Sequence, residues 1–287
     1  LLSRPGEAIY NDAAGNVEGN SPFQIVWLNE KLREEFLADL VERDNGQHRD
    51  MVVYEGNKPV HLAENTAFRD ANNSTKPLSV KAWLGGAMAI KEDTFATFRP
   101  SSASNLLIVG QQDEITTGMI GSSLESLQAQ YNKQDATFAL LDGTPADSSH
   151  ADVLETIAST MECHVARVGV RDVEAAMTTI HEELQRRMKD GASKCQDHFL
   201  VINAMHRFRD LRRDEDDFGY SMGSEDKPKS PAQILAELLK EGPPLGMHTI
   251  IATDTLANLN RALDRQSIRE FDMRVLLQMG SNDSTNL

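Results

Sequence analysis

The sequence predicts an α/β fold in which helices sandwich a mainly parallel sheet. Short apolar runs occur at 105–109, 136–141, 164–168, 198–202, 248–252 and 273–279. Helical patterns separate them near 117–131, 149–161, 171–189, 231–241 and 262–270. Runs that are apolar throughout are typical of strands buried on both faces. Their regular alternation with helices predicts a parallel sheet that is covered on both sides.

Several of these elements have well-marked ends. The helix at 171–189 has Asp172 at its start, and Gly191 follows its last turn, as helix-end preferences require. Pro243 and Pro244 end the helix at 231–241. Residues 214–230 are acidic and nearly free of apolar side chains, which predicts a long surface loop. A docking loop for a basic partner is the alternative.

The first 75 residues read as a small N-terminal appendage. Residues 1–27 combine turn formers with short apolar runs, as in a tail or an edge hairpin. Asn29 can cap a helix that extends to about Arg43. Its predicted buried stripe consists of Leu32, Phe36 and Leu40, and Leu37 and Val41 widen this stripe. Residues 51–54 are strand-like, and the polar stretch at 72–77 marks the boundary. We therefore expect an appendage at 1–75 and a main domain at 76–287.

The composition argues against a surface that binds DNA. The net charge is −15, with 44 acidic and 29 basic residues and a pI near 4.9. Affinity for the phosphate backbone depends on clustered Lys and Arg. The one arginine cluster is interleaved with Asp210 and Asp214, so a solvated helix flank is the simpler interpretation; its members are Arg207, Arg209, Arg212 and Arg213.

Other whole-chain features predict a cytoplasmic segment without membrane contact. No run of about 20 apolar residues is present. The two cysteines, Cys163 and Cys195, form neither a disulfide framework nor a metal-binding spacing. The sequence lacks an initiator Met and stops at Asn286-Leu287. We therefore expect a piece of a longer protein, with the main domain truncated at its C-terminus.

The most informative motif is a phosphate-binding loop without its chemistry. The apolar run 105–109 leads into Gly110, as a strand leads into a P-loop. A working loop reads G-x-x-x-x-G-K-[ST], in which backbone amides and Lys hold phosphates and the hydroxyl holds Mg²⁺. Gly110 and Thr117 fit this pattern, but Ile115 replaces the second glycine and Thr116 replaces the lysine.

Two carboxylates also stand where phosphate oxygens would lie. At an effective dielectric near 20 and roughly 6 Å, each like-charge pair costs about 3 kcal/mol. Asp113 and Glu114 should therefore repel a triphosphate. Thr116, Thr117 and Gly118 retain backbone amides that could bind a small anion at a helix N-terminus, although the neighbouring carboxylates oppose it.

The second half of the same machinery is also altered. P-loop ATPases place an acidic residue at the end of a later buried strand, where it holds magnesium and activates water. Here the run 198–202 ends in Asn203-Ala204. Asn is a weak magnesium ligand and Ala has no proton to exchange. The sequence thus predicts no catalytic residues, no metal site and the loss of ATP and Mg²⁺ binding.

Four segments in order resemble the motor domain of the FtsK/SpoIIIE family, in the FtsK–HerA branch of P-loop ATPases. The first two are the lead-in Ala82-Trp83-Leu84-Gly85 and the altered loop. The third is the segment from Gly246 to Thr253, after which Asp254 replaces a polar sensor glutamine. The fourth runs from Phe271 to Leu276 and is followed by Ser281-Asn282-Asp283-Ser284. The resemblance covers roughly residues 75–287. It implies a P-loop NTPase-like, RecA-type core whose catalytic motifs are degraded.

The resemblance also implies a place in a larger protein. Residues 4–8 and 22–27 are similar to the tail that follows such a motor domain in tandem-motor proteins. The type VII secretion ATPases EccC and EssC, with several such modules, are the closest analogy. It implies neighbouring ATPase modules as partners, an oligomer of the full-length protein, and a protein or peptide docked in the vacated cleft.

The leading hypothesis is therefore a catalytically silent module that docks, regulates or assembles. The alternative is an active, ATP-binding DNA translocase or secretion motor with an atypical loop, for which Arg274 or a neighbouring subunit's arginine would replace the lysine. A free-standing small-molecule enzyme is the third interpretation, and no nucleophile or base in the sequence supports it.

Overall fold

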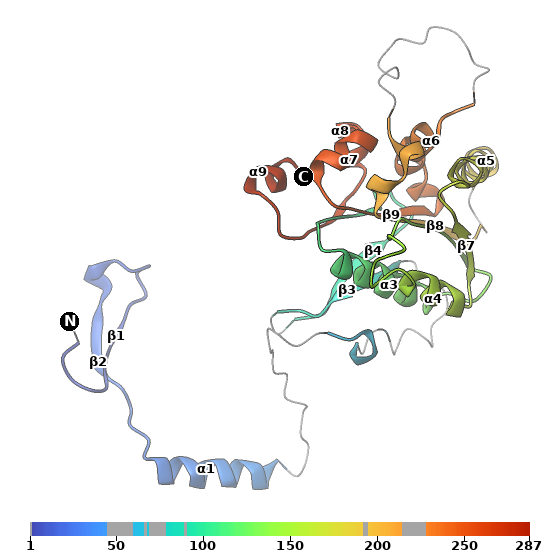
Figure 1. Ribbon diagram of the computed structural model, residues 1–287. Coiled ribbons are helices and arrows are strands. Elements are labelled where there is room, and N and C mark those ends of the chain that lie inside the picture. Colours follow the sequence, from blue (N-terminus) through green and yellow to red (C-terminus); the bar gives the residue numbers. More distant parts are fainter. Residues whose placement is uncertain are drawn as a thin grey trace. The chain divides into compact units, whose positions relative to one another are not determined.

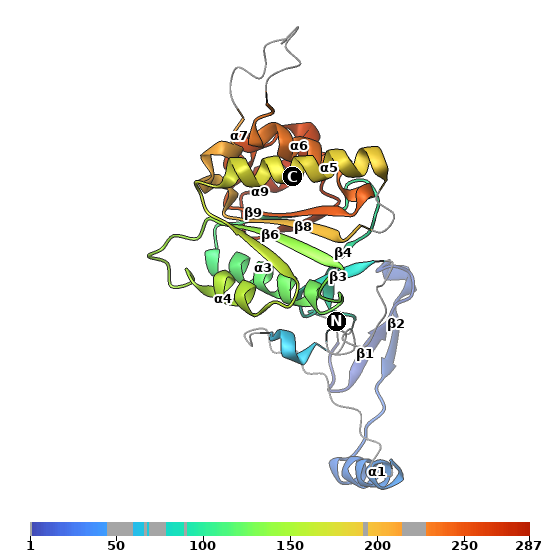
Figure 2. The same ribbon diagram turned by 90° about the vertical axis from the view of Figure 1, so that its right-hand side faces the viewer.

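Figures 1 and 2 show the computed structural model, which describes residues 2–44, 60–65, 68, 79–88, 91–191, 195–213 and 228–287. The chain divides into two compact units, Leu1–Tyr54 and Glu55–Leu287. The expected strand at 51–54, the boundary at 72–77 and most of the acidic segment at 214–230 lie outside the described residues. The division after residue 75 therefore stays a prediction.

The first unit contains a two-stranded hairpin and one helix. Strand β1 (Glu7–Tyr10) pairs antiparallel with β2 (Ser21–Gln24), and a 3₁₀ turn at Val17–Gly19 lies between them. Helix α1 spans Glu30–Arg43. The side chain of Asn29 accepts a hydrogen bond from the Lys31 amide at 2.8 Å. The hairpin and the capped helix are as predicted.

The predicted burial of the α1 stripe is wrong within this unit. Leu32, Phe36 and Leu40 are 43%, 53% and 60% exposed. One helix and a two-stranded hairpin have too little surface to enclose a core of their own. The described residues of the first unit therefore leave the apolar side of α1 uncovered.

The second unit is built on a six-stranded parallel sheet, as predicted. Its order is β10-β5-β9-β8-β6-β7, and every adjacent pair is parallel. The strands are β5 (Leu106–Val109), β6 (Ala136–Asp142), β7 (His164–Val168), β8 (Asp197–Asn203), β9 (Met247–Thr253) and β10 (Met273–Leu276). A separate antiparallel hairpin comprises β3 (Val80–Gly85) and β4 (Thr94–Phe98).

Helices lie on both faces of the sheet (Figure 2). Alternating side chains of the strands divide the core into two layers. Leu107, Leu200 and Ile251 face the layer that holds α5, α6, α7 and α8. Their sequence neighbours face α3, α4 and the β3–β4 hairpin. The helices are α3 (Asp113–Gln128), α4 (Val153–Thr160), α5 (Val173–Asp190), α6 (Pro231–Glu241), α7 (Leu256–Ala262), α8 (Arg265–Arg269) and α9 (Ser281–Asn286). The predicted sandwich is confirmed.

Aromatic rings form the centre of the second layer. Phe199 stacks on Phe138 at 5.2 Å between ring centroids and meets Phe98 edge-on at 5.5 Å. All three rings are fully buried. This packing attaches the β3–β4 hairpin to the sheet.

Two helices differ from the prediction. The helix expected at 117–131 begins four residues earlier, at Asp113. The single helix expected at 262–270 is instead two helices, α7 and α8. Asp264 causes this break, because its side chain accepts a hydrogen bond from the Ser267 amide at 2.7 Å and so begins a new helix.

Candidate nucleotide cleft

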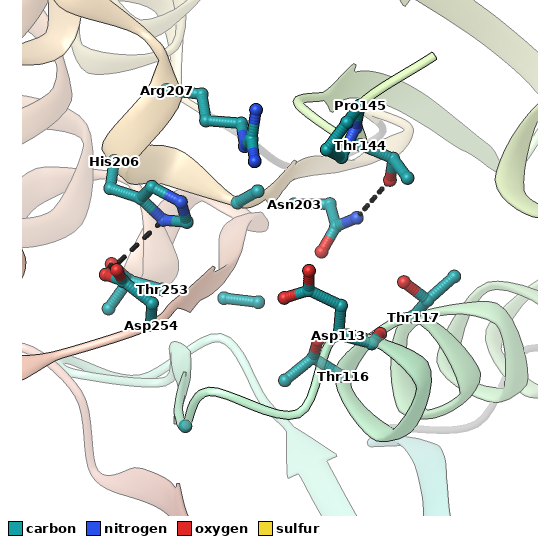
Figure 3. A pocket seen from close by; sticks show the side chains of 13 residues that line it. Asp113, Thr116, Thr117, Thr144, Pro145, Asn203, His206, Arg207, Thr253 and Asp254 are labelled. Atoms are coloured by element: carbon teal, nitrogen blue, oxygen red, sulfur yellow. Dashed lines mark hydrogen bonds and ion pairs between the residues drawn. The ribbon is translucent and has the colours of Figure 1, made fainter. Parts of the chain in front are cut away.

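The expected nucleotide cleft lies where four parallel strands end. Ligands of open α/β sheets bind at this edge. The carboxyl ends of β5, β6, β8 and β9 meet there with the first turns of α3 and a 3₁₀ turn at Met205–Arg207 (Figure 3). Its lining residues are Gly110, Asp113, Thr116, Thr117, Thr144, Pro145, Asn203, Ala204, His206, Arg207, Ala252, Thr253 and Asp254.

The loop after β5 is shorter than the P-loop pattern predicts. Only Gly110, Gln111 and Gln112 separate β5 from α3. The Thr116 amide already donates to the Gln112 carbonyl at 3.1 Å, as an ordinary helical bond. Thr116, Thr117 and Gly118 are therefore inside α3, and only the amides of the first turn are free of such bonds. The expectation that these three residues form a helix N-terminus differs from the structure by one turn.

The glycine that fits the motif has a packing role. A Cβ atom at Gly110 would lie 2.5 Å from the Cβ atom of Leu277. The Gly110 amide donates to the Thr253 carbonyl at 2.9 Å, which continues the β5–β9 ladder. Leu277 thus covers the start of the loop, and this contact alone requires glycine at position 110.

Carboxylates of the chain take the place at the helix start where an anion would bind. Asp113 and Glu114 are the acidic residues in the first turn of α3, where they interact favourably with the helix dipole. Figure 3 shows the Asp113 carboxyl group pointing into the cleft. The helix end that binds phosphate in a working P-loop therefore has two carboxyl groups of the chain in its first turn.

Asn203, at the expected magnesium position, is part of a partly buried hydrogen-bond network. Its Nδ2 donates to Asp142 Oδ1 at 3.1 Å and to Thr144 Oγ1 at 2.9 Å. Asp142 Oδ1 also accepts from the Thr144 amide at 2.9 Å and from Thr144 Oγ1 at 2.6 Å. The network joins the ends of β6 and β8, and Asn203 is only 3% exposed.

The residue after Asn203 has an uncommon backbone conformation. Ala204 adopts φ 51° and ψ 50°, in the left-handed region, which few residues other than glycine occupy. Its carbonyl lies near Gly143, where an added Cβ atom would approach it to 2.9 Å. The turn that follows β8 is therefore tightly packed against the loop that follows β6.

His206 and Asp254 pair across the other side of the cleft. His206 Nδ1 lies 3.4 Å from Asp254 Oδ1 (Figure 3). Burial lowers the pKa of His206 and outweighs the nearby Asp254 carboxylate, which raises it. Burial raises the pKa of Asp254, but the hydrogen bond from Asn258 and the nearby His206 lower it by more, so that the pKa lies below its ordinary value. We therefore expect a neutral His206 and an ionised Asp254 at neutral pH.

These side chains leave little space in the cleft. Its cavity volume is about 20 Å³, which is room for about one water molecule. Pockets that hold nucleotide-sized ligands are typically about 300–1,000 Å³. In the parts of the chain that the structure describes, no three His, Cys, Asp or Glu side chains come together as metal ligands do.

The structure does not bring Arg274 to the cleft. Its Nε donates to the Phe271 carbonyl at 2.9 Å and its guanidinium also contacts the carbonyls of Ile268 and Leu287. Arg274 lines a different groove, next to α8. Gly110, Thr116, Thr117 and Asn203 do come together in the cleft, whereas Gly118 is absent from its lining.

The members of the arginine cluster at 207–213 have different surroundings. Arg207 lines the cleft. Arg209 is exposed, and Arg212 donates to the His206 carbonyl at 2.9 Å.

Among the helices that the structure describes, none has both the length and the apolar character needed to cross a bilayer.

Sequence reasoning missed Asp142, Thr144 and the partnership of His206 with Asp254. Asp142 ends the apolar run at 136–141, at the same edge of the predicted sheet as Asn203. Its position directly after a buried strand is a signal that could have identified it. The His206 pair had no such signal, because its two members lie 48 residues apart in the sequence.

Solved structures are similar to this chain in fold. The cytoplasmic domain of the Thermomonospora curvata type VII secretion ATPase EccC matches 99% of this chain, with a TM-score of 0.53 and 14% identity. The cytoplasmic domain of EssC matches 72% of the chain, with a TM-score of 0.50 and 13% identity. This chain has the fold of these ATPases. The predicted P-loop NTPase-like core and its resemblance to EccC and EssC are therefore confirmed at the level of the fold.

The matches cover only 31% of the EccC chain and 39% of the EssC chain. No protein-family model matches the sequence, and no curated protein sequence is significantly similar to it.

Proposed function

We propose that residues 76–287 form a catalytically silent FtsK/SpoIIIE-like module that docks, regulates or assembles within a larger multi-module motor protein. The observation that carries this proposal is the filled cleft. A three-residue loop leads directly into α3, and the Asn203 network occupies the expected magnesium position. The fold supports an ATPase-type module, and the cleft lacks the groups that the chemistry needs.

The cofactor prediction extends this proposal. Binding of Mg²⁺ and ATP requires a cradle of free amides, a lysine and an acidic metal ligand. The side chains at these positions here are Thr116 and Asn203, and Asp113 adds a negative charge. We therefore propose that this module binds neither ATP nor Mg²⁺.

The alternative is an active ATPase with an atypical loop. It gains some support from Arg207, a cation that lines the cleft. It loses support from Arg274, whose guanidinium is held by carbonyls outside the cleft. The shortened loop would also have to unwind the first turn of α3 before phosphates could approach.

The N-terminal unit is the proposed contact surface for a neighbouring ATPase module of the same protein. Val26 and Trp27, which precede α1 in the chain, are 95% and 84% exposed, and the apolar side chains of α1 are exposed as well. Exposed apolar patches of this kind mark interaction sites. We propose that this unit packs against a neighbouring ATPase module. Changing Trp27 and Phe36 together to Asp should weaken binding of that module, and unchanged binding would contradict this assignment.

Steady-state ATP hydrolysis tests the silent-module proposal. Phosphate release by this chain with Mg·ATP should equal that of the buffer and of the Asn203→Ala variant. A turnover that depends on the chain, and that is lost on Arg207→Ala, would support the alternative.

A further inference from the structure

A groove lined by arginines lies away from the cleft in this acidic chain. It has a volume of about 490 Å³ and is bordered by α7, α8, α9 and β10, which Figure 1 shows near the C-terminal end. Arg265, Arg269 and Arg274 line it together with Asn260 and Asn286. Its lining includes no Asp or Glu, although acidic residues outnumber basic ones 44 to 29 in the whole chain.

Helix α8 separates charges between two grooves. Arg265 and Arg269, which are four residues apart and thus on one side of the helix, line the arginine groove. The carboxylates of Asp264 and Glu270 line another groove, next to α6. Arg265 and Arg269 form no ion pair with any carboxylate in the described parts of the chain. Their positive charge is therefore available to a ligand.

The third arginine is held in place. The Arg274 Nε donates to the Phe271 carbonyl at 2.9 Å, and one terminal nitrogen donates to the Ile268 carbonyl at 3.0 Å. The other terminal nitrogen donates to the Leu287 carbonyl, which leaves one N–H on each terminal nitrogen for a ligand. Carbonyls fix the side chain without neutralising its charge. A guanidinium that is fixed in this way loses little conformational entropy when it binds an anion.

We propose that this groove docks an acidic peptide segment of a partner protein, with Glu or Asp side chains on the three arginines. Guanidinium groups bind carboxylates through two parallel hydrogen bonds. The chain uses Arg at all three positions, rather than Lys, which favours this geometry.

The remaining lining favours a peptide over other anions. Leu256, which is half-buried, contributes most of the apolar surface, because Ile268 is only 7% exposed. This surface suits an aliphatic side chain between the acidic residues. The amides of Asn260 and Asn286 can both donate and accept, as a peptide backbone requires. Free phosphate uses neither feature. Single-stranded nucleic acid is bound by aromatic side chains that stack on bases, and none lines this groove.

The inference goes beyond the proposed function, because the groove shares no lining residue with the cleft. Peptide binding here does not depend on whether the cleft binds nucleotide.

Fluorescence anisotropy with a labelled Glu-Glu-Leu-Glu-Glu peptide tests the proposal at low salt, where charge contacts are strongest. The Arg265→Glu, Arg269→Glu double variant should bind at least about tenfold more weakly. The matched control is Arg171→Glu, Lys189→Glu, which makes the same charge change at exposed sites outside the groove. Its affinity should stay within about twofold of the original chain. Circular dichroism establishes that both variants are folded.

Four outcomes would overturn the proposal. They are no saturable binding of the peptide, equal weakening by the control variant, equal binding of the Gln-Gln-Leu-Gln-Gln peptide, and tighter binding of a short single-stranded DNA probe or of inorganic pyrophosphate than of the acidic peptide. Tight peptide binding that is lost only in the groove variant supports it.

Discussion

Placing an acidic residue at position 203 should destabilise the protein in a way that depends on pH. In the Asn203→Asp variant a carboxylate oxygen replaces Nδ2, which lies 3.1 Å from Asp142 Oδ1. At an effective dielectric near 20, two unit charges at this distance repel by about 5 kcal/mol. The pair can avoid this repulsion by binding one proton.

The free-energy cost of binding this proton limits how much the Asn203→Asp variant is destabilised. A free Asp side chain has a pKa of about 3.9, so protonating one at about pH 7.5 costs about 5 kcal/mol and at about pH 5 costs about 1.5 kcal/mol. The folded variant binds more protons than its unfolded chain, because the pair raises the folded pKa. Its stability is therefore greatest at low pH and decreases as the pH rises towards that raised pKa.

The control is Asn203→Ala, which removes the same two hydrogen bonds without adding charge. It should cost about 2 kcal/mol, because one bond goes to a charged group and one to a hydroxyl. That cost should be nearly the same at both pH values. Urea unfolding followed by fluorescence of the buried Trp83 measures both variants. Equal pH dependence of the two variants would refute the described network.

Three further predictions concern the cleft and the core. In Asp254→Asn, the pKa of His206 should fall below its already lowered value, since the carboxylate raises it; an NMR titration that shows a higher pKa would contradict the pairing. Gly143→Ala should destabilise the fold by about 1–3 kcal/mol, because its Cβ atom would lie 2.9 Å from the Ala204 carbonyl oxygen; an unchanged urea midpoint would show that this contact is loose. Phe199→Ala should cost about 3–5 kcal/mol by opening the ring cluster with Phe98 and Phe138, and a loss below about 1 kcal/mol in calorimetric melting would contradict that packing.

The sheet was predictable from the sequence because its four central strands, β5, β6, β8 and β9, contain buried apolar runs and because helical patterns separate the strands. The start of α3 was not, because the P-loop template places it near Thr117. Asp113 and Glu114 instead favour a helix that begins beside them. The break between α7 and α8 did have a local signal in the sequence, because Asp264 is a residue type that caps helices and lies inside the expected helix at 262–270.

The filling of the cleft depends on contacts that the sequence does not specify. Asp142 and Asn203 are partners in the β6–β8 register, so their interaction requires knowledge of which strands are neighbours. The stripe of α1 shows a second limit of prediction from sequence, because the pattern identifies an apolar side without showing whether it is buried. Its helical spacing predicted the apolar side correctly, but no described residue of its own unit covers this side.

Isothermal titration calorimetry with Mg·ATP tests the central claim of a silent cleft most directly. The reasoning from the short loop, the Asp113 carboxylate and the Asn203 network predicts no saturable heat up to about 1 mM nucleotide, a weak affinity by the standard of specific sites. One-to-one binding with a low-micromolar dissociation constant, lost on Arg207→Ala, would contradict it.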